Sequence, residues 1–286
     1  MQALDDWYRD HARELPWRAA DRTPWGVLVS EVMLQQTPVH RVEPVWRAWL
    51  TRWPTPADLA DADLAEVLRA WGRLGYPRRA LRLHQAAGLI QDRHGGQVPD
   101  DETALLALPG VGGYTAAAVR AFAFGRRAVV LDTNVRRVLA RALAGDALPP
   151  PHLVAAETAT ADALLPDDDA GAALTAAALM ELGALVCTAR GPRCEHCPLA
   201  QRCAWLAAGS PADTQAHRRR SQPWHGTDRQ ARGQVLAALR ATHGPVLLAD
   251  ITWPDRAQLD RCVATLAHDG LVVHDPGTAT VRLPSA

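Results

Sequence analysis

The segment LPGVGGYTAAAV, residues 108–119, carries the strongest indication of fold in this chain. The glycines Gly110, Gly112 and Gly113 predict a tight turn that opens a helix, and the apolar stretch ETALLAL before them predicts a preceding helix. Together they predict a helix–hairpin–helix. Glycine has no side chain, so backbone N–H groups there can approach an anion at the helix N-terminus. A G-x-G pair alone is often only a turn, so its function must be inferred from other residues of the chain.

Asp132 is the first informative neighbour, in the segment VVLDTNVRRV. It follows an apolar run and opens a helix, so it could serve only as an N-cap. It also lies among arginines and follows a hairpin that suits phosphate. It could therefore face a positive charge that develops on a substrate, and both interpretations stay open from these residues alone.

Cysteine spacing is a second, independent signal. Four cysteines form the pattern C-x6-C-x2-C-x5-C, namely Cys187, Cys194, Cys197 and Cys203. Four neighbouring thiolates can surround an iron–sulfur cluster or zinc, and two CxxC pairs would suit zinc better than this asymmetric spacing. Disulfides fit poorly, because disulfide frameworks belong to small secreted chains and this chain of 286 residues is expected to lack a signal peptide. Cys262, in an apolar periodic segment, is expected to be a small buried hydrophobe.

The distribution of charge is also informative. Lys and Arg total 31, all of them arginine, and balance 31 acidic residues. Six arginines lie in residues 120–141 against Asp132 alone, and six lie in residues 69–93 against Asp92 alone. The arginine fork suits phosphate, and clustered arginine is typical of a nucleic-acid face. Solvated helix faces would produce the same tracts.

Helical patterning fills residues 1 to about 205. Gly, Pro and Asp punctuation predicts helices at 63–71, 78–93, 101–107, 114–124, 133–144, 152–164 and 170–186. Residues 206–227 are expected to be a linker, whose basic tract at 217–220 suits phosphate. Residues 228–286 predict two helices and a terminal hairpin around Asp-Pro-Gly, which resembles a winged-helix module. No apolar run is long enough to span a membrane.

The hairpin, Asp132 and the cysteine spacing together resemble the helix–hairpin–helix DNA glycosylases that carry an iron–sulfur cluster, the group of endonuclease III and the adenine DNA glycosylase MutY. The resemblance to the MutY family covers residues 1 to about 205. Its motifs match in order and spacing: LPWR (15–18), SEVMLQQTPV (30–39), LGY (74–76), LPGVGGYTA (108–116), LDTNVRRVLAR (131–141) and MELGALVC (180–187).

The resemblance implies a mainly α fold, with a six-helix domain at 22–135 and a cluster domain built from 1–21 and 136–205. It implies a 4Fe-4S cluster on the four cysteines named above. It also implies a monomeric bacterial protein of the cytoplasm, associated with the nucleoid and not with a membrane. Its partner would be double-stranded DNA with A:8-oxoguanine or A:G mispairs.

The resemblance further assigns two carboxylates to glycoside-bond chemistry. Glu31 resembles the general acid that protonates adenine N7, and Asp132 the carboxylate that stabilises or captures the oxocarbenium ion. Elementary chemistry agrees, because a purine leaves only when it gains a proton and the sugar cation is stabilised. Glu31 lies in the apolar run VLVSEVML, which should raise its pKa. A partly exposed helix glutamate is the alternative.

Tyr114 occupies the position where bifunctional lyases such as endonuclease III carry a nucleophilic lysine. This chain has no lysine at that position or at any other. A lysine-based β-elimination is therefore excluded. The expected enzyme is monofunctional: it hydrolyses the bond and stops at an abasic site.

Further contacts to DNA follow from the resemblance. The target base must leave the duplex, and Gln35 and Gln36 resemble the wedge that fills the gap. The base-pocket and DNA-binding set is completed by Trp17, Arg18, Leu34, Val39, Tyr76, Gly110, Gly112 and Gly113. For Trp17 and Leu34, ordinary core packing is the alternative.

Three departures from the family pattern concern recognition of the bases. Pro77 replaces the second tyrosine after LG, and Thr175 and Ala177 stand where relatives carry an Asn and a Gln or Glu. The usual C-terminal Nudix-like domain, which helps to read 8-oxoguanine, is expected to be replaced by residues 228–286. The predicted activity is removal of adenine opposite 8-oxoguanine or guanine. The alternatives are a thymine/uracil mismatch glycosylase on the same scaffold and a non-catalytic DNA-binding cluster protein.

Overall fold

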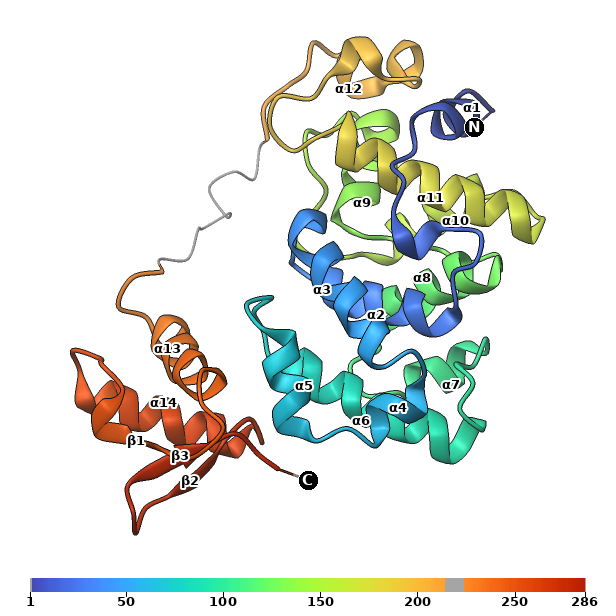
Figure 1. Ribbon diagram of the computed structural model, residues 1–286. Helices are drawn as coiled ribbons and strands as arrows, with labels where there is room; N and C mark the ends of the chain where they lie inside the picture. Colours follow the sequence, from blue (N-terminus) through green and yellow to red (C-terminus); the bar gives the residue numbers. More distant parts are fainter. Residues whose placement is uncertain (1, 214–223, 286) are drawn as a thin grey trace. The chain divides into compact units, whose positions relative to one another are not determined.

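The computed structural model describes residues 2–213 and 224–285 (Figure 1). The α-helices are α1 Gln2–His11, α2 Pro24–Leu34, α3 Val39–Arg52, α4 Pro56–Ala60, α5 Leu64–Trp71, α6 Arg78–His94, α7 Glu102–Leu106, α8 Gly113–Phe124, α9 Thr133–Leu139, α10 Ala155–Leu164, α11 Asp169–Leu185, α12 Ala204–Ala207, α13 Asp228–Arg240 and α14 Arg256–His268. The strands are β1 Val246–Leu247, β2 Val273–Asp275 and β3 Thr280–Arg282. Short 3-10 turns lie at η1 Pro16–Arg18, η3 Cys194–His196, η4 Ala200–Arg202 and η6 Leu248–Asp250, and α9 continues as a π-helical turn, η2 Ala140–Ala144.

The mainly helical fold is confirmed. The helices predicted at 63–71, 78–93, 114–124 and 170–186 form to within one residue at each end. The predicted helix at 133–144 also forms, but its last turn is π-helical. The basic tract at 217–220 lies outside the described residues.

Contacts within the chain divide it into two compact units. The first contains residues 1–28, 100–106 and 111–220, and the second contains residues 29–99, 107–110 and 221–286. This division differs from the predicted domains. Helix α8 packs on α11, which joins part of the predicted six-helix domain to the cysteine-bearing residues, while the C-terminal helices group with residues 29–99.

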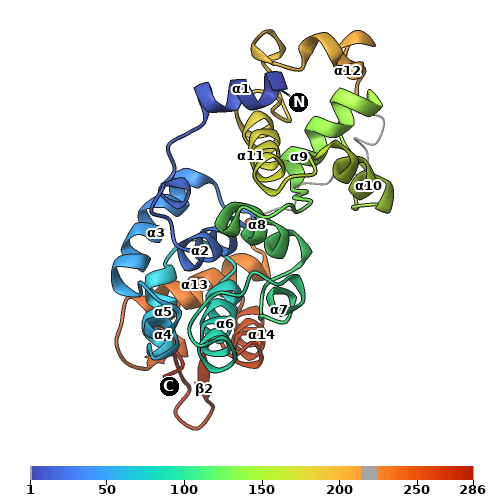
Figure 2. The ribbon, with the colours of Figure 1, turned by 90° about the vertical axis from the view of Figure 1, so that its right-hand side faces the viewer.

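The first unit is built around α11, which packs on α9 and on α1 (Figure 2). Their contact buries leucine and valine side chains, including Leu4, Val135, Val138, Leu179 and Leu182. The approach of α9 to α11 depends on Gly183. A Cβ at this position would lie 2.7 Å from Cβ of Asn134 and 2.8 Å from its carbonyl oxygen, so a larger residue would push the helices apart.

The second unit contains α3 to α6 and the C-terminal module, residues 228–285. Helix α4 packs on α6 and begins with a capping box, in which Thr55 and Asp58 each accept the other's backbone N–H. Trp49 and Trp71 are fully buried and meet edge to face, with ring centroids 5.7 Å apart.

The C-terminal module consists of α13, α14 and a three-stranded antiparallel sheet in the order β1-β3-β2 (Figure 1). Val281 on β3 pairs with Val246 on one side and His274 on the other. The predicted terminal hairpin is therefore confirmed, and so is the burial of Cys262 on α14. Helices and sheet together give the expected winged-helix-like arrangement.

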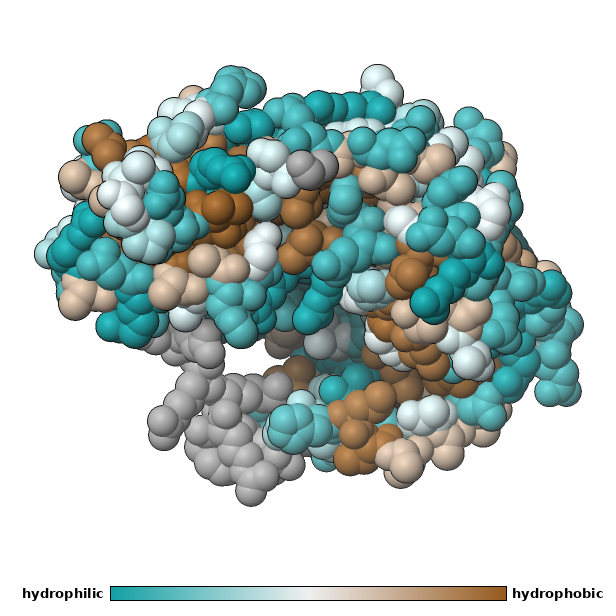
Figure 3. Space-filling model, turned by 90° about the horizontal axis from the view of Figure 1, so that it is seen from below, coloured by the Kyte–Doolittle hydropathy of each residue, from teal (hydrophilic) through white to brown (hydrophobic). Residues whose placement is uncertain are grey.

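The face shown in Figure 3 is predominantly hydrophilic, and its hydrophobic residues form small groups rather than one broad area. In the part of the chain that the structure describes, no helix has both the length and the apolar character that a membrane crossing requires.

Candidate active site and cysteine pocket

Asp132 is the N-cap of α9, in the first unit. Its Oδ1 accepts hydrogen bonds from the backbone N–H groups of Asn134 and Val135, at 2.9 and 2.7 Å, and its Oδ2 accepts one from the Asn134 side chain at 2.7 Å. Burial raises the pKa of Asp132, although these hydrogen bonds oppose the shift. The capping role is thus confirmed, and it fixes a half-buried carboxylate in one orientation.

Glu31 lies on the part of α2 that belongs to the second unit. Its exposed fraction is 5%, and its neighbours Ser30, Val32 and Met33 are buried as well. The alternative of a partly exposed helix glutamate is therefore excluded. A buried carboxyl group within an apolar helix is the environment that the sequence predicted for a general acid.

Arg79, which no motif singles out, ties the predicted wedge to the LGY turn. The side chain is buried, with 8% exposed, and it contacts no carboxylate among the described residues. Burial lowers its pKa to about 10, so it remains charged at neutral pH. Its two Nη atoms donate hydrogen bonds of 2.6 to 3.2 Å to the carbonyl oxygens of Val32, Met33, Gln35, Leu74 and Gly75 and to Oγ1 of Thr37.

Two residues of the predicted DNA-binding set have left-handed backbone conformations. The φ angle is 56° at Gln36 and 46° at Tyr76, a region that residues other than glycine rarely adopt. Such conformations persist where the surroundings hold them. Arg79 supplies that constraint, because it binds the carbonyl oxygens of Gln35 and Gly75, directly before each strained residue. Gln36 and Tyr76 are both exposed. Each therefore reaches solvent from a turn whose backbone Arg79 fixes.

The predicted hairpin glycines have the expected geometry. Gly110 has a φ of 83°, and Gly112 and Gly113 begin α8 with open space where side chains would stand. A Cβ at Gly110 would lie 3.0 Å from Cβ of Arg82. Arg82 is exposed and has no carboxylate partner in the described ranges. A positively charged side chain therefore lies next to the hairpin turn, which the motifs did not indicate.

Other predicted pocket residues are packed to different degrees. Trp17 is 5% exposed, as ordinary core packing requires, and Leu34 and Val39 are half-buried. Tyr114 packs on the apolar cluster between α8 and α11.

Arg18 has a structural partner, Glu181 on α11. The Glu181 side chain is fully buried and pairs with Arg18 Nη1 at 3.0 Å and with Arg13 Nε at 2.7 Å. Burial alone would raise the pKa of Glu181, but the Arg13 hydrogen bonds and the Arg18 charge outweigh it and lower the pKa to about 2. This ion pair joins the segment after α1 to α11. Arg18 belongs to the LPWR motif and Glu181 to the MELGALVC motif, and neither motif alone indicates that the two side chains meet.

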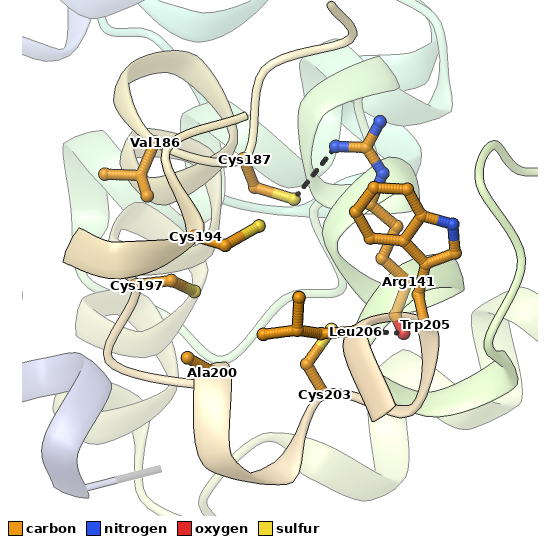
Figure 4. A pocket seen from close by; sticks show the side chains of 9 residues that line it. All are labelled: Arg141, Val186, Cys187, Cys194, Cys197, Ala200, Cys203, Trp205 and Leu206. Carbon is orange, nitrogen blue, oxygen red and sulfur yellow. Dashed lines mark hydrogen bonds between the residues drawn. The ribbon is translucent and has the colours of Figure 1, made fainter. Parts of the chain in front are cut away.

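The four clustered cysteines line one pocket of the first unit (Figure 4). Their side chains point toward a common cavity. The remaining lining is largely apolar and comprises Arg141, Val186, Ala200, Trp205 and Leu206. All four thiols are free, and none of them is paired in a disulfide in this structure.

The chemistry of this pocket fits a metal cluster. Burial raises the pKa of Cys197 to about 11 and also raises the pKa of Cys194, so four thiolates there need a compensating positive charge. Arg141 supplies part of it, with Nη1 at 3.4 Å from Sγ of Cys187. No three His, Cys, Asp or Glu side chains in the described residues are grouped as ligands of a single metal ion. The four thiols around the cavity are the soft donors that suit either zinc or an iron–sulfur cluster.

The arginines of residues 120–141 form ion pairs and hydrogen bonds within the protein. This differs from the expectation that they form a nucleic-acid face. Four of them form ion pairs: Arg120 with Glu102, Arg126 with Asp100, Arg127 with Asp162 and Arg136 with Glu157. Arg137 and Arg141 are buried and donate to carbonyl oxygens next to the cysteine pocket.

Comparisons with known proteins identify relatives of this chain. Residues 29–161 match the family described as HhH-GPD superfamily base excision DNA repair protein. The adenine DNA glycosylase of Mycolicibacterium smegmatis is 54% identical over 276 residues, which cover 94% of this chain and 91% of that protein. A thermostable thymine-DNA glycosylase aligns with a TM-score of 0.65 and 28% identity over 72% of this chain and 94% of its own. A non-covalent endonuclease III–DNA complex aligns with a TM-score of 0.62 and 26% identity over 73% of this chain and 95% of its own.

Proposed function

Because this chain belongs to the adenine DNA glycosylase family of the HhH-GPD superfamily of base excision DNA repair proteins, we propose that it removes adenine opposite 8-oxoguanine or guanine in duplex DNA. The observation that carries the proposal is the pair of carboxyl groups, one buried on α2 and one fixed at the start of α9. The protein acts as a monomer, in the cytoplasm at the bacterial nucleoid.

In the proposed reaction Glu31 donates a proton to N7 of the extruded adenine, and Asp132 faces the positive charge that develops on the sugar. A water then completes the hydrolysis. With no lysine in the chain, no lysine Schiff base forms, and the reaction ends at the abasic site. Gln35 and Gln36 fill the space left by the extruded base, and the turns that Arg79 fixes present Gln36 and Tyr76 to the DNA.

The test is single-turnover excision at saturating enzyme, with adenine, thymine or uracil placed opposite guanine or 8-oxoguanine. We expect adenine to be removed from both mispairs and Glu31→Gln to slow its removal by about 100-fold or more. The second candidate, a thymine/uracil glycosylase, is favoured by the similarity to the thymine-DNA glycosylase structure. Excision of thymine or uracil but not adenine would establish that candidate and overturn the proposal.

We also propose that the four pocket cysteines hold a 4Fe-4S cluster, supported by four thiols around one apolar cavity. When bound, the cluster would offset part of the negative charge of the thiolates and would fix the loops that carry them. Metal and sulfide analysis of purified protein should find about four iron and four sulfide per chain. Cys203→Ser should lower both, whereas the matched control Cys262→Ser should not, because Cys262 is buried in the C-terminal module. Zinc without iron or sulfide would contradict the proposal.

A further inference from the structure

The C-terminal module packs on the segment that carries the LGY turn, within the second unit. Single contacts join α13 to α5 and the residue after α14 to the start of α6. The contacts that hold it are Arg240 Nε to the Leu68 carbonyl oxygen at 3.2 Å, Arg69 Nη2 to the Thr242 carbonyl oxygen at 3.0 Å, and ion pairs of Asp269 with Arg78 and Arg232. Since Arg78 follows Tyr76 by two residues, the module is anchored next to the exposed tyrosine.

Arg229, at the start of α13, lies over two exposed aromatic rings. Its guanidinium carbon is 4.9 Å from the ring centroid of Tyr76 and 5.3 Å from that of Trp224. The exposed fractions of these residues are 40% for Tyr76 and 47% for Trp224. The module therefore contributes a cation, and Trp224, four residues before the module, contributes an indole ring, beside a tyrosine of the predicted DNA-binding set.

The charge of Arg229 is not neutralised within the described residues. Arg232, Arg256 and Arg261, on the same module, each form an ion pair with an aspartate. Arg229 has no such carboxylate among the described residues, and residues 214–223 contain no Asp or Glu. A cation placed between exposed aromatic rings matches a nucleobase, because the rings offer stacking faces and the guanidinium offers donors to a base edge.

We infer that Arg229 and Trp224 complete, with Tyr76, a site that reads the purine opposite the adenine to be removed. The inference rests on the proposed function and assigns part of opposite-base recognition to the C-terminal module. The two bases differ at one edge: guanine presents the acceptors O6 and N7, whereas 8-oxoguanine presents O6 and O8 on either side of an N7 that carries a hydrogen. A planar guanidinium fixed beside C8 directs its N–H donors to O8, an acceptor that guanine lacks, so the site favours 8-oxoguanine.

Four full-length variants test the inference against the wild type: Arg229→Ala, Arg229→Lys, Trp224→Ala and the control Arg261→Ala. The control removes the same charge from the same module, but from an exposed arginine that is already ion-paired. Single-turnover excision rates at saturation and dissociation constants are measured on A:8-oxoguanine and A:G duplexes and on a fully paired duplex. We expect Arg229→Ala and Trp224→Ala to reduce the preference for 8-oxoguanine over guanine about tenfold, and Arg261→Ala to leave it unchanged.

Arg229→Lys distinguishes recognition of the base by the guanidinium from an effect of positive charge alone. Lysine keeps the charge but not the fork, so it should lose the preference as alanine does; wild-type preference in Arg229→Lys would mean a phosphate contact and would overturn the inference. Equal weakening on all three duplexes in Arg229→Ala would overturn it as well. A wild-type protein that excises no adenine refutes the proposed function instead. Circular dichroism and cluster absorbance confirm folding, and Trp224→Ala still tests the site if Arg229→Ala does not fold.

Discussion

Asp132 caps α9 with one carboxylate oxygen while Asn134 binds the other. An asparagine at this position keeps an oxygen for the backbone N–H bonds but carries no negative charge. We expect Asp132→Asn to retain mispair binding and to lower single-turnover excision by about 100-fold or more, because the developing sugar cation loses its counter-charge. The measurements are excision at saturating enzyme, the dissociation constant for an A:G duplex and the melting temperature.

Asp168→Asn is the matched control for that prediction. Asp168 is the N-cap of α11 and accepts a hydrogen bond from Gly171 N–H at 2.7 Å. The same chemical change at a second helix start should leave the excision rate unaltered. Equal losses of excision in the two variants would show that Asp132 matters only as a helix cap.

Glu181 is a residue whose ionisation stabilises the fold. Its pKa falls from the ordinary 4.5 to about 2 in the folded protein, so its contribution is complete above about pH 4.5 and disappears as the pH falls toward 2. Glu181→Gln should destabilise the protein by about 2–3 kcal/mol at pH 7, because Arg13 and Arg18 lose their partner in a buried site. Urea midpoints of both proteins, measured from pH 7 downward, should converge in acid. A constant difference across the whole range would contradict this.

At the scale of helices and strands, local signals place several elements but not all of them. Punctuation by Gly, Pro and Asp places α6 and α11 to within one residue, and the Asp-Pro-Gly turn places the β2–β3 hairpin. The π-helical turn at 140–144 was not predicted, since it follows from contacts around Arg141 and the cysteine pocket rather than from local propensity. The same is true of the links made by Arg79 and Glu181, because nothing in an arginine or a glutamate indicates a partner far along the chain.

The packing of α9 on α11 provides an element-scale prediction. Gly183→Ala places a methyl group against the backbone of Asn134, and overpacking of this kind costs about 2 kcal/mol. Since Asp132 begins α9, excision should fall together with stability. Gly88→Ala, on α6, is the control: a Cβ there meets nothing within 4 Å, so this variant should be as stable as the wild type or about 0.5–1 kcal/mol more stable. Unchanged stability of Gly183→Ala, measured by urea unfolding, would show that the helices can separate without cost.

For the whole molecule, the division into two compact units predicts that removing the C-terminal module affects stability and base preference but not iron content. The cysteine pocket belongs to the first unit and the C-terminal module to the second. Truncation after Gly226 should therefore leave iron content unchanged, lower the melting temperature and keep measurable adenine excision with weaker preference for 8-oxoguanine. Iron analysis, thermal melts and excision at saturating enzyme test the three parts. Complete loss of excision from a truncated protein that keeps its iron would place the module in the catalytic pocket.

Asp132 and Arg141 lie on one uninterrupted run of helix, with the carboxylate at its first turn and the guanidinium beside Cys187 at its last. A change that increases the mobility of the helix end beside Cys187 should therefore also increase the mobility of the end that carries Asp132. Under the proposed cluster assignment, a protein made without iron would therefore lose the position of its Asp132 carboxylate and would leave mispairs in place for other repair enzymes. For an enzyme that removes an undamaged base, this is the safer way to fail.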